Sequence, residues 1–159
     1  MYYKISLFLI VLFGRVCSQS WDDYLDNLIE QSKDGAGQAQ CDKAAIFSLD
    51  GGAPWTSTDY PNALNLSQDE RSDISKGFNS LSLDGIFLLT KITVEGINYD
   101  FLIEYDNNLV LYKNKGHGSI IIQRSVTALV ACHVVEGGHV EYAVKAVITV
   151  ADHFEASGF

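Results

Sequence analysis

Side chains that could carry out chemistry are few and scattered in this 159-residue sequence. There is no phosphate-binding loop, no G-x-S-x-G and no H-E-x-x-H. The four histidines stand singly: His117, His133, His139 and His153. The three cysteines form no C-x-x-C pair, the spacing typical of structural zinc: Cys17, Cys41 and Cys132. We interpret His133 as a core or edge residue, and Cys41 and Cys132 as inert buried thiols. No two carboxylates stand out as a general acid and base, so we expect neither an enzyme nor a metal site.

Aromatic side chains, in contrast, gather near the two ends of the chain. Trp21 and Tyr24 lie at the start of a predicted first helix, and His153 and Phe159 lie at the end of a predicted last one. Trp55 falls in a predicted hairpin. Taken singly, each tryptophan is typical of a core anchor. Together, they favour a surface made jointly by the two terminal helices.

Charge excludes one class of partner. The chain has 11 basic and 20 acidic residues, a formal net charge of −9 and a pI near 4.7. A protein that coats nucleic-acid backbones needs a positive face, so nucleic-acid binding is excluded. Apolar residues at 47% and charged residues at 19% are typical of a folded chain. The length suits one domain.

The first eighteen residues differ from the rest of the chain. Residues 1–18 read as a secretory signal peptide, with an early lysine, a short apolar run and small residues before Gln19. The run is shorter than the roughly 20 apolar residues that cross a bilayer. An upstream sequence wrongly joined to the gene would give the same pattern. Asn65-Leu66-Ser67 is a glycosylation acceptor that matters only if the chain is secreted.

The first half of the remaining chain predicts two helices and a hairpin. Ser20 is the expected N-cap of a helix whose apolar positions follow the i, i+3, i+4, i+7, i+8 spacing of one buried stripe: Trp21, Tyr24, Leu25, Leu28 and Ile29. That arc is too wide for one core face, so part of it should form a second surface. Asp50-Gly51-Gly52 indicates a hairpin turn between strands 44–49 and 53–58. A capping box at residues 67–70 begins a second helix, expected to end at about Gly77.

The second half predicts an antiparallel meander followed by a last helix. Turn signals separate strands at 86–94, 99–105, 109–112, 119–125 and 128–135, and the connections are too short for crossover helices. After Gly138, apolar positions recur at helical spacing up to Phe154: Ala143, Val144, Val147, Ile148, Ala151 and Phe154. The pattern predicts one α+β domain over residues 19–159, with helices covering an antiparallel sheet.

Several motifs then occur together along the chain: Ser20-Trp21-x-x-Tyr24-x-Asp26-x-Leu28, Cys41-x-x-Ala44-Ala45-Ile46, Asp50-Gly51-x-x-x-Trp55, Gly77-Phe78, Asp84-Gly85-Ile86, Thr93-Val94-x-Gly96-x-x-Tyr99, Lys113-x-Lys115-Gly116 and Val150-Ala151-Asp152-His153-Phe154. With these, residues 19–159 resemble a profilin. The resemblance implies a central antiparallel sheet, with the N- and C-terminal helices packed together on one face and a short helix elsewhere. It implies two binding surfaces and no reaction.

The first implied surface is an aromatic groove for proline-rich segments. The positions that match it are Trp21, Tyr24, Trp55, His153 and Phe159. Polyproline II is already stiff, and flat rings stack on pyrrolidine faces, so such a groove suits such a ligand. Phe159 stands where most animal profilins end in tyrosine, which removes one hydroxyl worth about 1 kcal/mol at most.

The second implied surface binds monomeric actin. The positions that retain matching residues are Lys113, Lys115, His139 and Lys145. Departures are Asn98 in place of a basic residue, the added acids Asp100 and Glu104, and Val144 in place of a polar contact. Because actin is acidic, these changes predict reduced affinity. The net charge disfavours phosphoinositide binding, for which Lys113, Lys115 and Arg124 are the available basic spot.

Two functional hypotheses follow from the resemblance. The first is a cytoplasmic, cytoskeletal regulator of actin polymerisation that binds actin monomers and proline-rich partners without a cofactor. The alternative is a secreted binding module on a profilin scaffold, without access to actin. A cleaved N-terminus near Gln19 and a glycan on Asn65 would favour the second.

Overall fold

The computed structural model describes residues 21–84, 89–106 and 108–159, and the backbone alone over 81–84. Its centre is a six-stranded antiparallel sheet in the order β1-β6-β5-β4-β3-β2. The strands are β1 (Cys41–Ser48), β2 (Lys91–Val94), β3 (Ile97–Tyr105), β4 (Leu109–Asn114), β5 (Gly118–Arg124) and β6 (Ala128–Val134). The helices in the described ranges are α2 (Asp23–Gln31), α3 (Gln68–Asp84) and α4 (Val140–Ala156).

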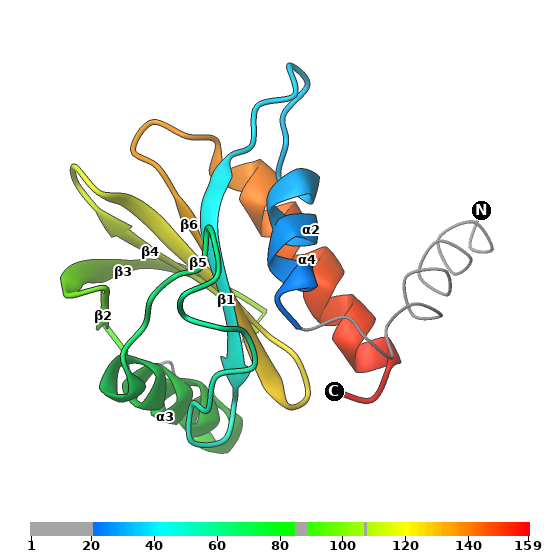
Figure 1. Cartoon of the computed structure of the whole chain (residues 1–159). Helices are drawn as coiled ribbons and strands as arrows, with labels where there is room; N and C mark the ends of the chain where they lie inside the picture. The colour runs from blue at the N-terminus through cyan, green and yellow to red at the C-terminus, as the bar shows by residue number, and fades with distance from the viewer. Residues whose placement is uncertain (1–20, 85–88, 107) are drawn as a thin grey trace.

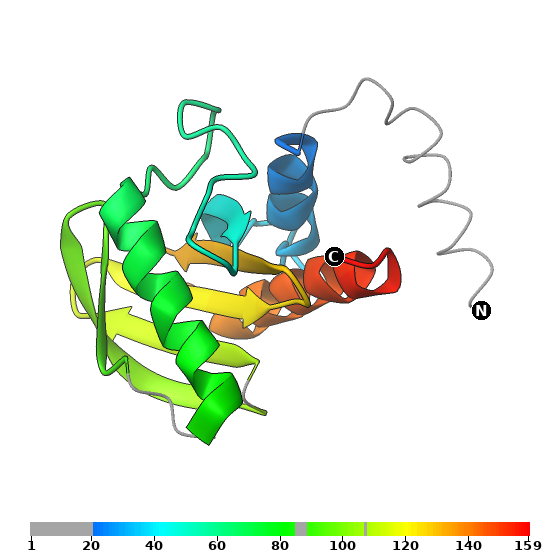
Figure 2. The ribbon, with the colours of Figure 1, turned by 90° about the horizontal axis from the view of Figure 1, so that it is seen from below.

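The helices cover opposite faces of the sheet. Helices α2 and α4 lie side by side on one face, and α3 crosses the other, as Figures 1 and 2 show from two directions. Successive strand residues point to opposite faces, so β4 places Leu111 in the core under α2 and α4, and Tyr112 in the core under α3. The predicted α+β fold, with the terminal helices together on one face, is confirmed.

Small and apolar residues bring the two terminal helices together. Leu25 and Leu28 of α2 are fully buried, as the predicted stripe requires. Helix α4 packs through alanines at 143, 146 and 151, which allow a close approach, and through Val147, Val150 and Phe154. The result places the start of α2 beside the end of α4 (Figure 1).

The predicted second strand of the hairpin, 53–58, does not form. One isolated bridge, between Phe47 and Pro54, and separate backbone hydrogen bonds join this stretch to β1 in place of a continuous ladder. Proline lacks an N–H and cannot continue a ladder, and Gly51 and Gly52 both turn the chain at positive φ. Residues 53–64 still cover the edge of the sheet. The Trp55 N–H donates to the Ile46 carbonyl at 2.9 Å, and the Leu64 N–H donates to the Ala44 carbonyl at 2.8 Å.

Helix α3 is longer than the sequence indicates. It continues through Gly77 to Asp84, although glycine there looked like a terminator. The side chain of Leu89 lies where a Cβ on Gly77 would be, so this glycine provides room for close packing rather than a helix end. The capping box is confirmed, because the Glu70 N–H donates to Ser67 Oγ at 3.1 Å and the Ser67 N–H to Glu70 Oε2 at 3.0 Å.

The predicted meander is largely confirmed. Strands β3, β4, β5 and β6 lie within two residues of the expected bounds. Of the predicted strand 86–94, the structure forms Lys91–Val94, and residues 85–88 lie outside the described part of the chain. The signal-like segment 1–18 and the expected cap Ser20 also lie outside it. Helix α2 instead begins after Asp22, whose side chain makes no capping hydrogen bond.

Candidate functional site

Five aromatic side chains from three distant segments meet at one place. We call them the terminal aromatic cluster: Trp21, Tyr24, Trp55, His153 and Phe159. The Trp21 indole lies at the centre, with ring centroids 4.8 Å from Trp55, 5.7 Å from Tyr24 and 5.6 Å from Phe159. All five residues predicted for the first surface are therefore brought together.

Tyr24 and His153 join the two terminal helices through both ring contact and a hydrogen bond. Their rings are stacked at 5.9 Å with an interplanar angle of 30°. The Tyr24 hydroxyl lies 3.2 Å from Nε2 of His153. Trp21, Tyr24, Trp55 and His153 remain partly exposed, and Phe159 is 39% exposed. The wide apolar arc of the first helix thus forms the second surface that the sequence predicts.

Phe154 is the buried base of the cluster. It is 1% exposed, and its ring contacts those of Trp21 at 5.7 Å, Tyr24 at 5.0 Å and Trp55 at 6.0 Å. Helical spacing predicted Phe154 as a core residue. Its support of three cluster rings could not be read from that spacing, because the rings come from elsewhere in the chain.

Backbone hydrogen bonds fix the end of the chain beside these rings. The Phe159 N–H donates to the Phe154 carbonyl at 2.8 Å, and the Val126 N–H donates to the Phe159 carbonyl at 3.2 Å. Val126 is 60% exposed in the β5–β6 turn, next to the cluster. A single apolar residue in a turn carries no signal, so this neighbour of the cluster could not be predicted from the sequence.

Burial favours the uncharged forms of the two titratable members of the cluster. Burial raises the pKa of Tyr24 and lowers the pKa of His153. The cluster therefore presents ring faces together with a phenol, indole N–H groups and a neutral imidazole. Such an arrangement can stack on flat apolar groups and exchange hydrogen bonds with carbonyls.

The second predicted set of residues is exposed and lies partly together. Lys113 and Lys115 lie at the β4–β5 turn, and Gly118, which begins β5, packs directly against residues 134–136 at the end of β6. His139 follows as the N-cap of α4, so these three residues share one end of the sheet. Lys145 lies about one and a half turns further along the exposed side of α4.

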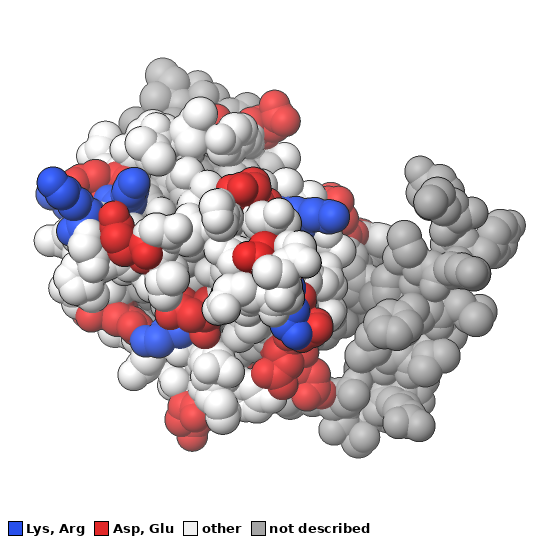
Figure 3. All heavy atoms as spheres, turned by 90° about the horizontal axis from the view of Figure 1, so that it is seen from above, with Lys and Arg blue, Asp and Glu red and all other residues white. Residues whose placement is uncertain are grey.

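Acidic groups accompany these cations. In the strand register, Asp100 lies opposite both Lys113 and Lys91, and its carboxylate is 3.6 Å from Nζ of Lys91. Figure 3 looks onto this end of the molecule and shows acidic and basic side chains interspersed, without a continuous basic surface.

Arg124 does not join the two lysines in a basic spot. It ends β5, about 20 Å along the strand from Gly118. Its guanidinium donates to the Phe78 carbonyl at 3.2 Å on the α3 face, whereas Lys113 points to the face of α4. The basic spot suggested for phosphoinositides is therefore divided between two places.

Strand β3 adds an exposed apolar strip next to β4. Its members are 39–54% exposed: Phe101, Leu102, Ile103 and Tyr105. Phe101 lies opposite Tyr112 on the α3 face of the sheet, whereas Ile103 lies opposite Leu111 on the face of α2 and α4. The sequence pattern predicts a strand over residues 99–105 but does not indicate that its apolar residues are exposed. A continuous apolar run has no alternation from which an exposed face could be recognised.

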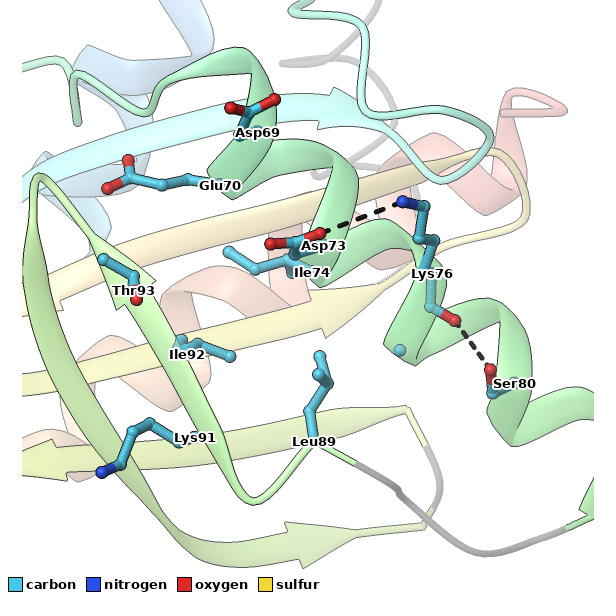
Figure 4. Close-up of a pocket in the computed structure, with 11 residues that line it drawn as sticks. Asp69, Glu70, Asp73, Ile74, Lys76, Ser80, Leu89, Lys91, Ile92 and Thr93 are labelled. Atoms are coloured by element: carbon cyan, nitrogen blue, oxygen red, sulfur yellow. Dashed lines mark hydrogen bonds and ion pairs between the residues drawn. The ribbon is translucent and has the colours of Figure 1, made fainter.

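A cavity of about 550 Å³ lies between α3 and β2. Figure 4 shows its side chains, among which Asp73 and Lys76 are 4.0 Å apart and Lys91 points away from the cavity. In the ranges that the structure describes, no three potential metal-ligating side chains gather, and no helix is long and apolar enough to cross a membrane.

The profilin family model matches residues 19–159. This chain belongs to the profilin family. A profilin of Clypeaster japonicus is 45% identical over 139 residues, which is 87% of this chain and 99% of the relative. The sequence resemblance is thereby confirmed.

Solved profilins have the same fold. A Schizosaccharomyces pombe profilin is 26% identical, with a TM-score of 0.65 over 88% of this chain and all of its own. LokiProfilin2, solved in complex with rabbit actin, is 18% identical, with a TM-score of 0.63 over 84% of this chain and 94% of its own. Mouse profilin IIa, solved with a double repeat from the FH1 domain of mDia1, is 21% identical, with a TM-score of 0.62 over 89% of this chain and all of its own.

Proposed function

We propose that this profilin regulates actin polymerisation by binding monomeric actin on one surface and proline-rich segments on another, without bond chemistry. The observation that carries the proposal is the meeting of Trp21, Trp55 and His153 in the terminal aromatic cluster. Side chains 132 positions apart in the sequence make one aromatic surface next to the packed terminal helices.

The cluster suits a proline-rich ligand for physical reasons. A polyproline II segment is preformed, so little ordering entropy is lost when it binds. Its pyrrolidine faces stack on indole and phenol rings, and its carbonyls accept hydrogen bonds from groups such as an indole N–H. Mouse profilin IIa was solved with repeats of an FH1 domain, and the two chains share their fold.

Titration with a proline decapeptide tests this surface. The Trp21→Ala variant should bind at least tenfold more weakly, because it removes the ring that contacts three other cluster members. Tyr105→Ala is the matched control, since Tyr105 is an exposed aromatic on β3 and should leave affinity unchanged. Wild-type affinity for Trp21→Ala would contradict the proposal.

For actin, we propose the end of the sheet that carries Lys113, Lys115 and His139, together with Lys145 of α4. Of the apolar strip of β3, Ile103 and Tyr105 lie on the same face of the sheet as Lys113 and would add buried contact area. LokiProfilin2 was solved in complex with rabbit actin. Asp100 opposite Lys113 weakens attraction to an acidic partner, so we propose an affinity below that of a more basic profilin.

Reversing the charge of Lys113 or of Asp100, which lie opposite each other in the sheet, tests the actin surface. Lys113→Glu should weaken binding to actin monomers, and Asp100→Lys should strengthen it, with both effects falling as salt rises. Lys76→Glu is the control, because Lys76 is also exposed but lies on α3, which covers the opposite face of the sheet (Figure 2). Equal affinities for all three variants would contradict this placement.

We also propose that the protein acts in the cytoplasm with the cytoskeleton. Family membership supports this location. Sequencing of the mature N-terminus, together with a mass measurement of the protein from its own cells, tests it. A chain that begins near Gln19 and carries a glycan on the exposed Asn65 would contradict the location and favour the secreted module.

A further inference from the structure

Asp22 stands at the start of α2 but does not serve as a helix cap. Its backbone is the N-cap, where an aspartate side chain ordinarily accepts an N–H of the first turn. Here the carboxylate makes no such bond. Oδ1 instead accepts the backbone N–H of Ser57 at 2.6 Å, and the residue is only 9% exposed. A short bond from an N–H to a largely buried carboxylate is among the stronger hydrogen bonds in proteins.

This bond connects the two segments that carry the tryptophans of the cluster. Asp22 follows Trp21 directly, and Ser57 comes two residues after Trp55. The segment that carries Trp55 is also bound to β1. The Trp55 and Thr56 N–H groups donate to the Ile46 carbonyl at 2.9 and 3.2 Å. Those bonds fix Trp55 to the sheet, whereas Asp22 fixes it to α2.

We propose that Asp22 is a positioning residue for the proline-binding surface, holding Trp55 against Trp21 before a ligand arrives. The inference rests on the proposed proline binding, and it goes beyond it by assigning the alignment of the two indoles to a residue that is not one of the rings. Rings held in place before binding lose less conformational entropy on association. The 4.8 Å separation of the two indoles is the geometry that Asp22 maintains.

A second carboxylate on the same helix provides a matched control. Asp26 Oδ2 accepts the Tyr60 hydroxyl at 2.6 Å and so also connects α2 to this segment. This hydrogen bond is exposed, and Tyr60 comes five residues after Trp55 in the sequence, just before the chain returns to β1 at Ala63. Asp26→Asn keeps the side-chain shape, removes one charge from α2 as Asp22→Asn does, and should leave the spacing of the indoles unchanged.

The experiment compares Asp22→Ala, Asp22→Asn and Asp26→Asn in the full-length chain, with two readouts. The first, without ligand, is the exciton couplet in circular dichroism that two indoles at this separation produce. The second is the dissociation constant for a proline decapeptide. Asp22→Ala should weaken the couplet and raise the dissociation constant about tenfold. Asp22→Asn keeps an acceptor without the charge and should raise the dissociation constant about threefold. Asp26→Asn should match wild type in both.

Each outcome bears on a separate statement. If Asp22→Ala keeps both the couplet and the affinity of wild type, the inference is wrong. If Asp22→Ala does not fold, Asp22→Asn decides by the same two readouts, and wild-type values for it would overturn the inference. If wild type fails to bind the decapeptide, the proposed function fails, while the couplet still tests whether Asp22 aligns the indoles.

Discussion

The hydroxyl of Tyr24 and Nε2 of His153 lie 3.2 Å apart, although 129 residues separate them in the chain. Their rings also stack at 5.9 Å, so one pair joins α2 to α4 by both polar and ring contact. Because Tyr24 and His153 are partly exposed, the pair lies on the surface that we assign to ligand binding.

Tyr24→Phe should weaken binding of a proline decapeptide by about fivefold, the effect of losing one hydrogen bond of roughly 1 kcal/mol. The ring stays, so stacking is retained, but the hydrogen bond to His153 is lost, so the unfolding midpoint should fall by about 2–5 °C. Isothermal titration and thermal unfolding measure the two quantities. Tyr142→Phe, on α4 but outside the cluster, serves as the control. An unchanged affinity for Tyr24→Phe would mean that the hydroxyl takes no part in binding.

His153 should make the protein less stable in acid. Burial lowers the pKa of His153 below its usual 6.5, so the folded chain disfavours the imidazolium. As pH falls below about 6.5, the unfolded chain takes up the proton first, and the free energy of unfolding decreases until the lowered pKa is passed. Urea unfolding of wild type and His153→Gln across pH 5 to 7.5 measures this difference. A gap between them that stays constant with pH would contradict the prediction.

His133 should change the free energy of unfolding with pH in the opposite direction to His153. Its Nδ1 lies 2.6 Å from a carboxylate oxygen of Asp42, and its Nε2 lies 2.6 Å from the His117 carbonyl. Both partners are acceptors, so both nitrogens donate when the ring is protonated. Burial is the largest influence and lowers the pKa of His133, and Lys43 also lowers it, but the two hydrogen bonds and the charge of Asp42 outweigh them and raise the pKa above 6.5.

The stabilisation from His133 is therefore present below pH 6.5 and is lost as pH rises through the raised pKa. Asp42→Asn should remove most of this dependence, because it removes the charged acceptor. An NMR titration of the imidazole, with urea unfolding at pH 5.5 and 8.5, measures both effects. The exposed His139 is the control and, as His139→Gln, should leave the dependence intact. A pKa of His133 at or below 6.5 would contradict the assignment.

The parts of the fold that depend on neighbours in sequence could be predicted, and those that depend on distant partners could not. Strands β3 to β6 follow one another through short turns, so the turn residues between them mark their bounds. The edge of β1 is covered by an irregular segment, held by bonds such as Trp55 N–H to Ile46, which no local pattern encodes.

The candidate site shows the same division. The aromatic residues were identified by type and position, and their convergence follows from the packing of the terminal helices. The bond between Asp22 and Ser57 was not predicted, because an acidic residue in the first turn of a helix is ordinary, where the helix dipole favours negative charge. Asp100 could be paired with Lys113 only after the strand register was known.

Gly77 offers a test of why α3 extends beyond its predicted end. A Cβ at this position would overlap the side chain of Leu89. Gly77→Ala should therefore lower the free energy of unfolding by about 1 kcal/mol, because the cost of overpacking exceeds the gain in helix propensity. In a Leu89→Ala background the space is open, and the same change should raise stability by up to about 1 kcal/mol. Gly35→Ala, where nothing lies within 4 Å, is the control for glycine replacement. Urea unfolding of the four variants in the cycle gives the coupling between positions 77 and 89. If Gly77→Ala stabilises the protein equally in both backgrounds, close packing against Leu89 is not the reason for this glycine.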